Sequence, residues 1–408
     1  MMKFEAVKAS KDNKNWEQLI SRQTELYGRS DDVRGEFARD YTRILHCLAY
    51  RRLKHKTQVF YNIGNDHICT RMEHVAHVES VSSTIAGALG LNTELTKAIA
   101  IGHDLGHAPF GHKCEIMIRE LSKKHLGKDF WHEQNGLRFV DKLELLEDEQ
   151  MNYRNLDLTY AVRDGIISHC GEVNKNRLFP RSEFIDLDDF NTPGEYEACT
   201  WEGCVVKLAD KIAYVGRDIE DAKRLHLLNE SDYKTLEDFA GRFKSDAVNT
   251  TVIINRLVSD ICEHSSVENG ICLSEEYAQY LNEIKKFNYV RIYDNLRLKH
   301  FEEYAKLVID SIFKELLAAY DKTALFASLK AREKDYPMLF SDFSSWLKKY
   351  VNEDILPDNL KPEAKKYLNE KIYGNLDDEK TFIQAIIDYI SGMTDSYAIR
   401  IYNELITF

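Results

Sequence analysis

Several features are scarce or missing in this chain of 408 residues. It has only six prolines and no stretch of the roughly 18 uninterrupted apolar residues that a membrane-spanning helix requires. Few prolines, with 44% hydrophobic and 30% charged residues, favour a folded, helix-rich protein over a disordered one. Residues 1–18 lack the apolar stretch of a secretory signal. We therefore expect a cytoplasmic protein with no membrane partner.

Cysteine pairs and positive charge are also lacking. The eight cysteines are scattered and form no Cys-x-x-C motif, which argues against a zinc ribbon or a redox motif and favours reduced thiols. A net charge of −12 opposes loose attraction to nucleic acid or to anionic membranes. A local site for one anion is compatible with this charge, because basic residues cluster between Arg51 and Arg71.

Histidine is concentrated in the first part of the chain. Eleven of the 14 histidines precede residue 170, and residues 103–112 read His-Asp-Leu-Gly-His-Ala-Pro-Phe-Gly-His. This density predicts a metal site. Imidazole and carboxylate ligands suit a divalent transition ion, or Mg or Mn, better than a thiolate zinc site.

The hydrophobic pattern predicts an all-α fold. One helix should span His74–Leu89 and stop at Gly90, and the next should begin after Asn92 or Thr93 and carry the His103-Asp104 pair. Further helices are expected at about 37–53, 156–169, 201–217, 301–320 and 381–389, with an extended segment at 58–61 and a long loop at 171–194. We expect an HD-type core over 1–270 and a helical C-terminal part over 271–408, packed on the core as one continuous domain.

Two glycines beside the histidines are expected to destabilise a helix. Gly102 and Gly106 each cost on the order of 1 kcal/mol relative to alanine. We interpret them as providing space for an ion and a substrate beside His103 and His107. Close helix packing is the alternative.

An ion held by His103 and Asp104 needs further protein ligands. His74 upstream and Asp210 downstream are the candidates, each on its own predicted helix. Four mixed nitrogen and oxygen ligands leave positions open for water and a phosphate oxygen, as a catalytic site requires. Taken singly, each histidine could be an ordinary hydrogen-bonded residue, and Asp210 could form an ion pair with Lys211.

These four residues match the H…HD…D signature of the HD-domain metal-dependent phosphohydrolase superfamily. The flanking segments resemble the dGTPase-type deoxynucleoside triphosphate triphosphohydrolases, and the resemblance extends over nearly the whole chain. The matching segments are Tyr50–Lys54, Lys56–Phe60, Thr70–His74, His103–His112 with Glu115, Leu208–Tyr214 and Asp388–Asp395.

The resemblance implies hydrolysis of a dNTP, with dGTP favoured, to the deoxynucleoside and inorganic tripolyphosphate by water attack at the α-phosphorus. The cofactor would be a divalent ion such as Mn, Mg or Fe. His112 would be the acid that protonates the leaving 5′ oxygen, supported by His107 and Glu115. His132 and Glu133 would orient the water or the α-phosphate, and a solvent-exposed polar turn is their alternative.

The resemblance also implies substrate-binding residues. Arg71 and Lys211 would contact phosphate, where a fixed cation offsets transition-state charge. Gln58, Tyr214 and Asp218 would line the deoxyribose pocket, with the tyrosine ring crowding the 2′ carbon. Core packing for Tyr214 and a solvated ion pair for Asp218 are the alternatives.

The chain departs from the family pattern in two motifs, at Val75-Ala-His77 and at His132-Glu-Gln-Asn-Gly136. Neither departure removes a metal ligand, and both leave the base preference open. For His77 we favour a surface side chain.

Two other functions are compatible with these motifs. One is a different HD phosphohydrolase, such as a nucleoside monophosphatase or a cyclic-nucleotide phosphodiesterase. The other is a dNTP-sensing or single-stranded-DNA-binding regulator, although the acidic charge weighs against nucleic acid as the main partner. The resemblance further implies a homo-oligomer, with dNTPs as activators in some relatives.

Overall fold

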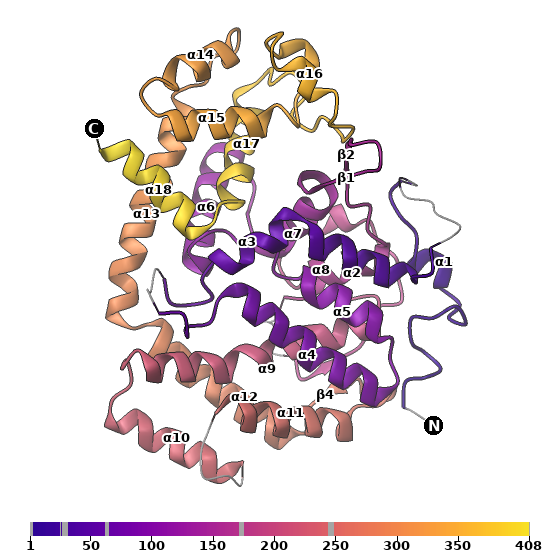
Figure 1. Cartoon of the computed structure of the whole chain (residues 1–408). Helices are drawn as coiled ribbons and strands as arrows, with labels where there is room; N and C mark the ends of the chain where they lie inside the picture. Colours follow the sequence, from indigo (N-terminus) through magenta and orange to yellow (C-terminus); the bar gives the residue numbers. More distant parts are fainter. Residues whose placement is uncertain are drawn as a thin grey trace. The chain divides into compact units, whose positions relative to one another are not determined.

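The computed structural model describes residues 3–24, 26, 32–61, 65–170, 175–243 and 249–407. The fold is all-α, as predicted, with short two-stranded sheets (Figure 1). Contacts divide the chain into two compact units whose segments alternate along the sequence. Unit 1 comprises Met1–Leu45, Gln58–Asp104 and Asp157–Lys299, and unit 2 comprises His46–Thr57, Leu105–Leu156 and His300–Phe408. The expected division near residue 270 stays a prediction.

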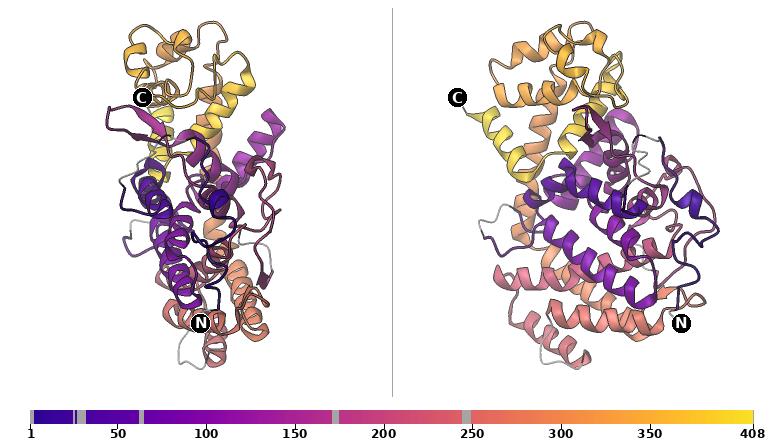
Figure 2. Two further views of the ribbon diagram at one scale, coloured as in Figure 1. Left: turned by 90° about the vertical axis from the view of Figure 1, so that its right-hand side faces the viewer. Right: turned by 45° about the vertical axis from the view of Figure 1, so that its right-hand side comes forward.

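Unit 1 contains long helices (Figure 2) and one small two-stranded sheet. Its helices are α1 Trp16–Leu19, α2 Glu36–His46, α4 Arg71–Leu89, α5 Thr93–Gly102, α8 Tyr160–Ser168, α9 Trp201–Arg224, α10 Glu230–Arg242, α11 Thr250–His264 and α12 Glu275–Asn288, with the short turns η3 Leu187–Asp189 and η4 Tyr289–Tyr293. Strands β3 Arg177–Leu178 and β4 Ile271–Cys272 pair antiparallel. Strand β3 lies in the region expected as a loop, 171–194, of which residues 171–174 lie outside the described part.

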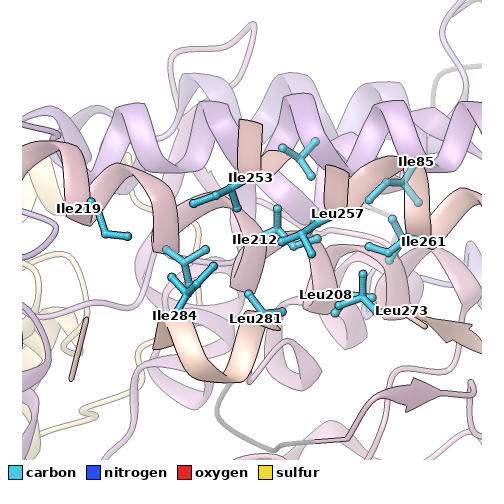
Figure 3. Close-up of a cluster of buried hydrophobic side chains, with 14 of the residues drawn as sticks. Ile85, Leu208, Ile212, Ile219, Ile253, Leu257, Ile261, Leu273, Leu281 and Ile284 are labelled. Carbon is cyan, nitrogen blue, oxygen red and sulfur yellow. The ribbon is translucent and has the colours of Figure 1, made fainter. Parts of the chain in front are cut away.

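Helix α9 is central to the core of unit 1 and contacts α4, α5, α8, α11 and α12. Leu208, Ile212 and Ile219 place apolar side chains along one face of α9, at the spacing that aligns residues on a helix. The side chains of Leu257 and Ile261 on α11 lie beside them (Figure 3). This packing fixes the helix that carries Asp210.

The helix ends near the histidines follow local capping rules. Thr70 and Glu73 form a capping box at the start of α4, and Gly90 ends that helix with a positive φ of 83°. Asn92 caps α5 by accepting hydrogen bonds from two backbone amides. The structure therefore confirms the predicted end of the helix at Leu89 and the predicted cap at Asn92.

Helix α5 ends at Gly102, so the expectation that it carries His103 and Asp104 is wrong. His103 is the C-cap residue, and the following residues up to Gly106 form turns. His107 therefore does not lie one helical turn beyond His103. The extended segment expected at 58–61 is also wrong, since these residues form bends and a turn.

The two costly glycines serve close packing, which corrects our preferred interpretation. A Cβ on Gly102 would lie 2.8 Å from Ile166 Cδ1 on α8. A Cβ on Gly106 would lie 2.1 Å from the backbone nitrogen of Gly136 and 2.1 Å from the carbonyl oxygen of His132. Both glycines let chain segments approach more closely than any side chain would permit.

Unit 2 is helical as well. Its elements are α3 Leu48–Arg52, η1 Leu53–His55, α6 Gly111–Leu126, α7 His132–Arg138, η2 Phe139–Leu143, the antiparallel strands β1 Leu145–Glu147 and β2 Tyr153–Asn155, most of α13 Leu296–Leu317, α14 Leu325–Arg332, α15 Pro337–Leu347, η5 Glu353–Ile355, α16 Lys361–Ala364, α17 Glu379–Ser391 and α18 Asp395–Ile406. Arg138 donates to both carboxylate oxygens of buried Asp388, and the Tyr373 hydroxyl also donates to it at 2.6 Å. In the described part of the chain, no helix has the length and apolar character needed to cross a membrane.

Candidate metal and phosphate site

The four expected metal ligands gather within unit 1. His74 comes from α4, Asp210 from α9, and the His103-Asp104 pair from the end of α5. His74 Nε2 lies 2.9 Å from Asp210 Oδ1, and His103 Nε2 lies 3.5 Å from Asp104 Oδ1 and 3.8 Å from Asp210 Oδ1. Ligand atoms that share one ion at bonding distance are roughly 3 to 4 Å apart. The donor set therefore fits a divalent cation.

His103 is oriented as a ligand. Its Nδ1 lies 2.6 Å from the carbonyl oxygen of Ala100. A carbonyl can only accept, so Nδ1 carries a hydrogen, and in the neutral ring Nε2 carries the lone pair. Nε2 is buried and has no hydrogen-bond partner within the described residues. A buried polar atom of this kind needs a partner, and a metal ion would supply one.

The charges of His74 and Asp210 support each other. Burial opposes the charged imidazole, but the hydrogen bond and charge of Asp210 raise the pKa of His74 overall. Burial likewise opposes ionisation of Asp210, yet the His74 hydrogen bond and the neighbouring imidazoles lower its pKa to about 2. A metal ion must therefore displace a proton from His74, which makes binding depend on pH.

Arg71 provides a buried cation beside the ligands. Its Nη1 donates to Asp104 Oδ2 at 2.8 Å, and the side chain is 1% exposed. Its Nε and Nη2 are buried without a hydrogen-bond partner among the described residues. An arginine with two unsatisfied donors is suited to an anion such as phosphate.

Lys211 follows Asp210 on α9 and is also buried. Burial, followed by the charges of Lys285 and Lys207, lowers its pKa to about 8. The ammonium therefore remains mostly protonated at neutral pH, and an incoming phosphate would stabilise its charge further.

The candidate sugar-binding residues also lie in unit 1. Asp218 lies two helical turns after Lys211 on α9, and burial raises the pKa of its carboxyl group to about 7. The Tyr293 hydroxyl donates a hydrogen bond to Asp218 Oδ2. Asp218 is therefore buried and bonded to a tyrosine, which contradicts the alternative of a solvated ion pair. Tyr214 is half-buried against the core of unit 1, and Gln58 has a buried Oε1 without a hydrogen-bond partner in the described part of the chain.

The other expected catalytic residues gather within unit 2. Glu115 Oε2 lies 3.0 Å from His132 Nδ1 and 3.7 Å from His112 Nδ1. The His107 and His132 rings stack with centroids 3.8 Å apart. Burial opposes ionisation of Glu115, but the charge of His132 and the hydrogen bonds of both histidines hold its pKa well below the usual range.

His132 and Glu133 begin helix α7, with side chains 13% and 2% exposed. Their alternative as a solvent-exposed polar turn is therefore wrong. The backbone of His132 and Gly136 lies close to Gly106, and Asn135 Nδ2 donates to the Gly106 carbonyl at 2.6 Å. This close packing explains why the segment is buried.

Two residues were missed in the sequence. His169 is the C-cap of α8, and its ring centroid lies 5.0 Å from that of His103. The signal for His169 was a histidine at the end of a predicted helix, which capping alone could explain. Tyr293 lies in η4, and nothing in its local pattern indicates contact with Asp218. His77, expected at the surface, is half-buried, with Nε2 2.9 Å from Arg217 Nη2.

Comparisons with known proteins agree with this arrangement. The HD domain family model matches residues 71–215, and the phosphohydrolase-associated domain model matches residues 350–404. The fold and the gathered ligands thus define an HD-domain, metal-dependent phosphohydrolase, whose cofactor is a divalent ion.

The chain is similar over most of its length to proteins named deoxyguanosinetriphosphate triphosphohydrolase-like. It is 34% identical to that of Clostridium tetani, over 92% of this chain and 86% of the relative. It is 32% identical to that of Caldanaerobacter subterraneus over the same shares, and 30% identical to that of Clostridium perfringens over 98% and 95%. The chain belongs to the deoxyguanosinetriphosphate triphosphohydrolase-like family.

Proposed function

We propose that the protein hydrolyses deoxynucleoside triphosphates, with dGTP favoured, to the deoxynucleoside and inorganic tripolyphosphate. The observation that carries this proposal is the unsatisfied guanidinium of Arg71 beside the ligand group of His74, His103, Asp104 and Asp210. Family membership supports the nucleotide substrate. The expected homo-oligomer and cytoplasmic location stay predictions.

The residues of unit 1 would activate the water and bind the phosphates. The bound ion would polarise a phosphoryl oxygen or lower the pKa of the attacking water. Arg71 would hold phosphate oxygens through Nε and Nη2, and Lys211 would add a second cation. These fixed charges would counter the negative charge that develops on the α-phosphoryl group.

Proton transfer is assigned to the group in unit 2. A nucleoside 5′ oxygen leaves poorly unless it is protonated, and imidazole is a suitable acid near neutral pH. His112 would donate this proton, since its side chain is 57% exposed and Glu115 orients its Nδ1 side. His107, His132 and Glu133 would keep that carboxylate and imidazole network in place and orient the water or the α-phosphate.

Sugar recognition is assigned to Asp218, Tyr214 and Gln58. A carboxyl group with a pKa near 7 can donate or accept a hydrogen bond, which suits the 3′-hydroxyl. The Tyr214 ring would crowd the 2′ carbon and reject ribose. The buried Oε1 of Gln58 would gain a partner from the sugar or base.

Product analysis tests the function. The Mn²⁺-loaded protein is incubated with each dNTP separately, and the products are resolved by ion-exchange chromatography. Nucleoside and tripolyphosphate in equal amounts support the proposal. Orthophosphate or pyrophosphate as the only phosphate product contradicts it and favours another HD phosphohydrolase. A pure sensor would instead bind dNTPs and assemble without turnover.

A second dNTP position, for an activator, is proposed in unit 2. A cavity of about 860 Å³ is lined by aromatic rings, including Trp346 and Tyr389, and by Lys349 and Arg400. Neither of these cations forms an ion pair with a carboxylate in the described part of the chain, and each lies over a tyrosine ring. Stacking surfaces and available cations suit a base and its phosphates.

The activator position is tested with Lys349→Ala. This change should abolish activation by a second dNTP while basal turnover with the first is retained. Lys142→Ala, at a solvent-exposed ion pair with Glu370, is the control. Unchanged activation in Lys349→Ala would contradict this assignment.

A further inference from the structure

Two helices of unit 1 end in the same way. His103 is the C-cap of α5 and His169 is the C-cap of α8. Each places its Nδ1 2.6 Å from the carbonyl oxygen three residues earlier, at Ala100 and Ile166. Because a carbonyl only accepts, both Nδ1 atoms carry hydrogen, and in the neutral ring the lone pair that binds a cation is then on Nε2.

The packing of α5 against α8 brings these two helix ends together. A Cβ on Gly102 would lie 2.8 Å from Ile166, and a Cβ on Gly165 would lie 2.5 Å from Ile99. The two glycines therefore let the helices approach closely. The His103 and His169 rings meet edge to face, with centroids 5.0 Å apart.

His169 has the spacing of a metal ligand. Ligand atoms of His103, Asp104 and His169 lie within 4.8 Å of one another, as do those of His74, His103 and Asp210. The His169 side chain is 2% exposed, so its imidazole lies in the protein interior. The two groups of potential ligands share His103.

Because both groups contain His103, we expect them to bind one ion rather than two. His103 has a single nitrogen that is not used by the backbone, and a neutral imidazole lone pair binds one cation. Both groups must therefore serve the same ion if His103 serves both. Two aspartates and three neutral imidazoles would also balance the charge of a divalent ion.

We propose that His169 is a fifth protein ligand of the metal ion, bound through Nε2. This proposal rests on the metal-dependent function proposed above and extends its ligand set. Five nitrogen and oxygen ligands leave one position of an octahedral shell for water or a phosphate oxygen. Such a shell favours ions with octahedral preference, such as Mn²⁺, over tetrahedral Zn²⁺.

Pulsed EPR of the Mn²⁺-loaded wild-type protein tests the proposal directly. The number of imidazole nitrogens coupled to Mn²⁺ should be three, from His74, His103 and His169. Two coupled nitrogens would overturn the proposal. This measurement requires no variant and does not depend on turnover.

Metal affinity gives an independent test with variants. His169→Ala and the more conservative His169→Gln should each weaken Mn²⁺ binding by roughly tenfold or more, a typical effect of removing a group that supports a metal site. Binding is followed by the EPR signal of free Mn²⁺. His264→Ala is the matched control, because His264 ends α11 with Nδ1 3.0 Å from the Asp260 carbonyl and belongs to neither ligand group. It should bind Mn²⁺ as the wild type does.

Three outcomes separate the proposals. An affinity unchanged within twofold in both His169 variants, or two ions in the wild type with one lost in the variants, would overturn the fifth ligand. Three coupled nitrogens without dNTP hydrolysis would keep the ligand and contradict the proposed function. Hydrolysis with only two coupled nitrogens would do the reverse.

Discussion

The two histidine groups of this protein differ in how their nitrogens are directed. In unit 1, Nδ1 of His103 and of His169 each lies 2.6 Å from a backbone carbonyl oxygen, and Nε2 of His103 faces Asp104 and Asp210. In unit 2, the His107 and His132 rings stack at an interplanar angle of 19°. Ligand atoms of His107, His112, Glu115 and His132 also lie within 4.8 Å of one another, but the in-plane lone pairs of two nearly parallel stacked rings do not converge on one ion between them.

The carboxylates of the two groups differ as well. Unit 1 offers two aspartates to its imidazoles, whereas unit 2 offers two glutamates: Glu115 faces both His112 and His132, and Glu133 Oε2 lies 3.4 Å from His132 Nδ1. Although burial opposes its ionisation, the charge of His132 and the hydrogen bonds of both histidines hold the pKa of Glu115 well below its usual range. The comparison teaches that clustered histidines of similar composition can be directed toward ion binding or toward proton transfer by the orientation of their rings.

The largest effect should come from breaking the ligand group of unit 1. His103→Ala should abolish bound metal and lower kcat on the order of a thousandfold or more, because both water activation and charge neutralisation depend on the ion. Metal content by mass spectrometry and dNTP turnover are measured together. His77→Ala, one turn after His74 on α4, should retain full metal content. Retained metal and turnover in His103→Ala would contradict the ion site.

A smaller loss is expected in unit 2. His112→Ala should lower kcat by about 10² to 10⁴, the usual contribution of a general acid. The metal content should remain that of the wild type, since His112 is not a ligand of the unit 1 group. Loss of metal in this variant would contradict the assignment of ion binding to unit 1 and proton transfer to unit 2.

Much of the ligand group could be predicted from sequence because its chemistry is local. The His103-Asp104 pair, the end of helix α4 at Leu89 and the Asn92 cap depend on residues close together in the chain, although α4 begins at Arg71 and not at the predicted His74. His169 was missed because its meaning depends on the contact between α5 and α8. That contact depends on how Gly102 and Gly165 pack against side chains of the facing helix, which the sequence does not give.

The packing partners of Gly102 and Gly106 could not be predicted from the sequence either. Gly102 lies in helix α5 and Gly106 in the turns that follow, so only Gly102 carries the expected cost within a helix, and the reason for both glycines lies in their packing partners. Ile166 faces Gly102, and the backbone of Gly136 faces Gly106. The role of Tyr293 was likewise hidden, because it meets Asp218 from 75 residues away in the sequence.

Alanine at each glycine sharpens the comparison of the two units. Gly106→Ala should destabilise the protein more than Gly102→Ala, since its Cβ would meet backbone atoms, which cannot rotate away. Overpacking of the Ile166 side chain by Gly102→Ala should cost about 1 to 3 kcal/mol. Chemical denaturation measures both. Equal losses would contradict the packing argument.

The smallest effect concerns two aspartates of α9. Cationic partners lower the pKa of Asp210 to about 2, whereas burial raises that of Asp218 to about 7. An unfolded aspartate has a pKa near 3.9, so between about pH 4 and 7 the folded Asp218 keeps a proton that the unfolded chain releases. This difference makes the free energy of unfolding fall as the pH rises through that window.

Asp218→Asn removes this dependence. Relative to the wild type, the variant should gain stability with rising pH, by on the order of 1 kcal/mol per pH unit between pH 4 and 7. Urea denaturation at several pH values measures the difference. The Tyr293 hydroxyl lowers the pKa of Asp218, so Tyr293→Phe should raise that pKa and extend the window to higher pH. A constant difference between Asp218→Asn and the wild type would show that Asp218 is ionised throughout, like Asp210.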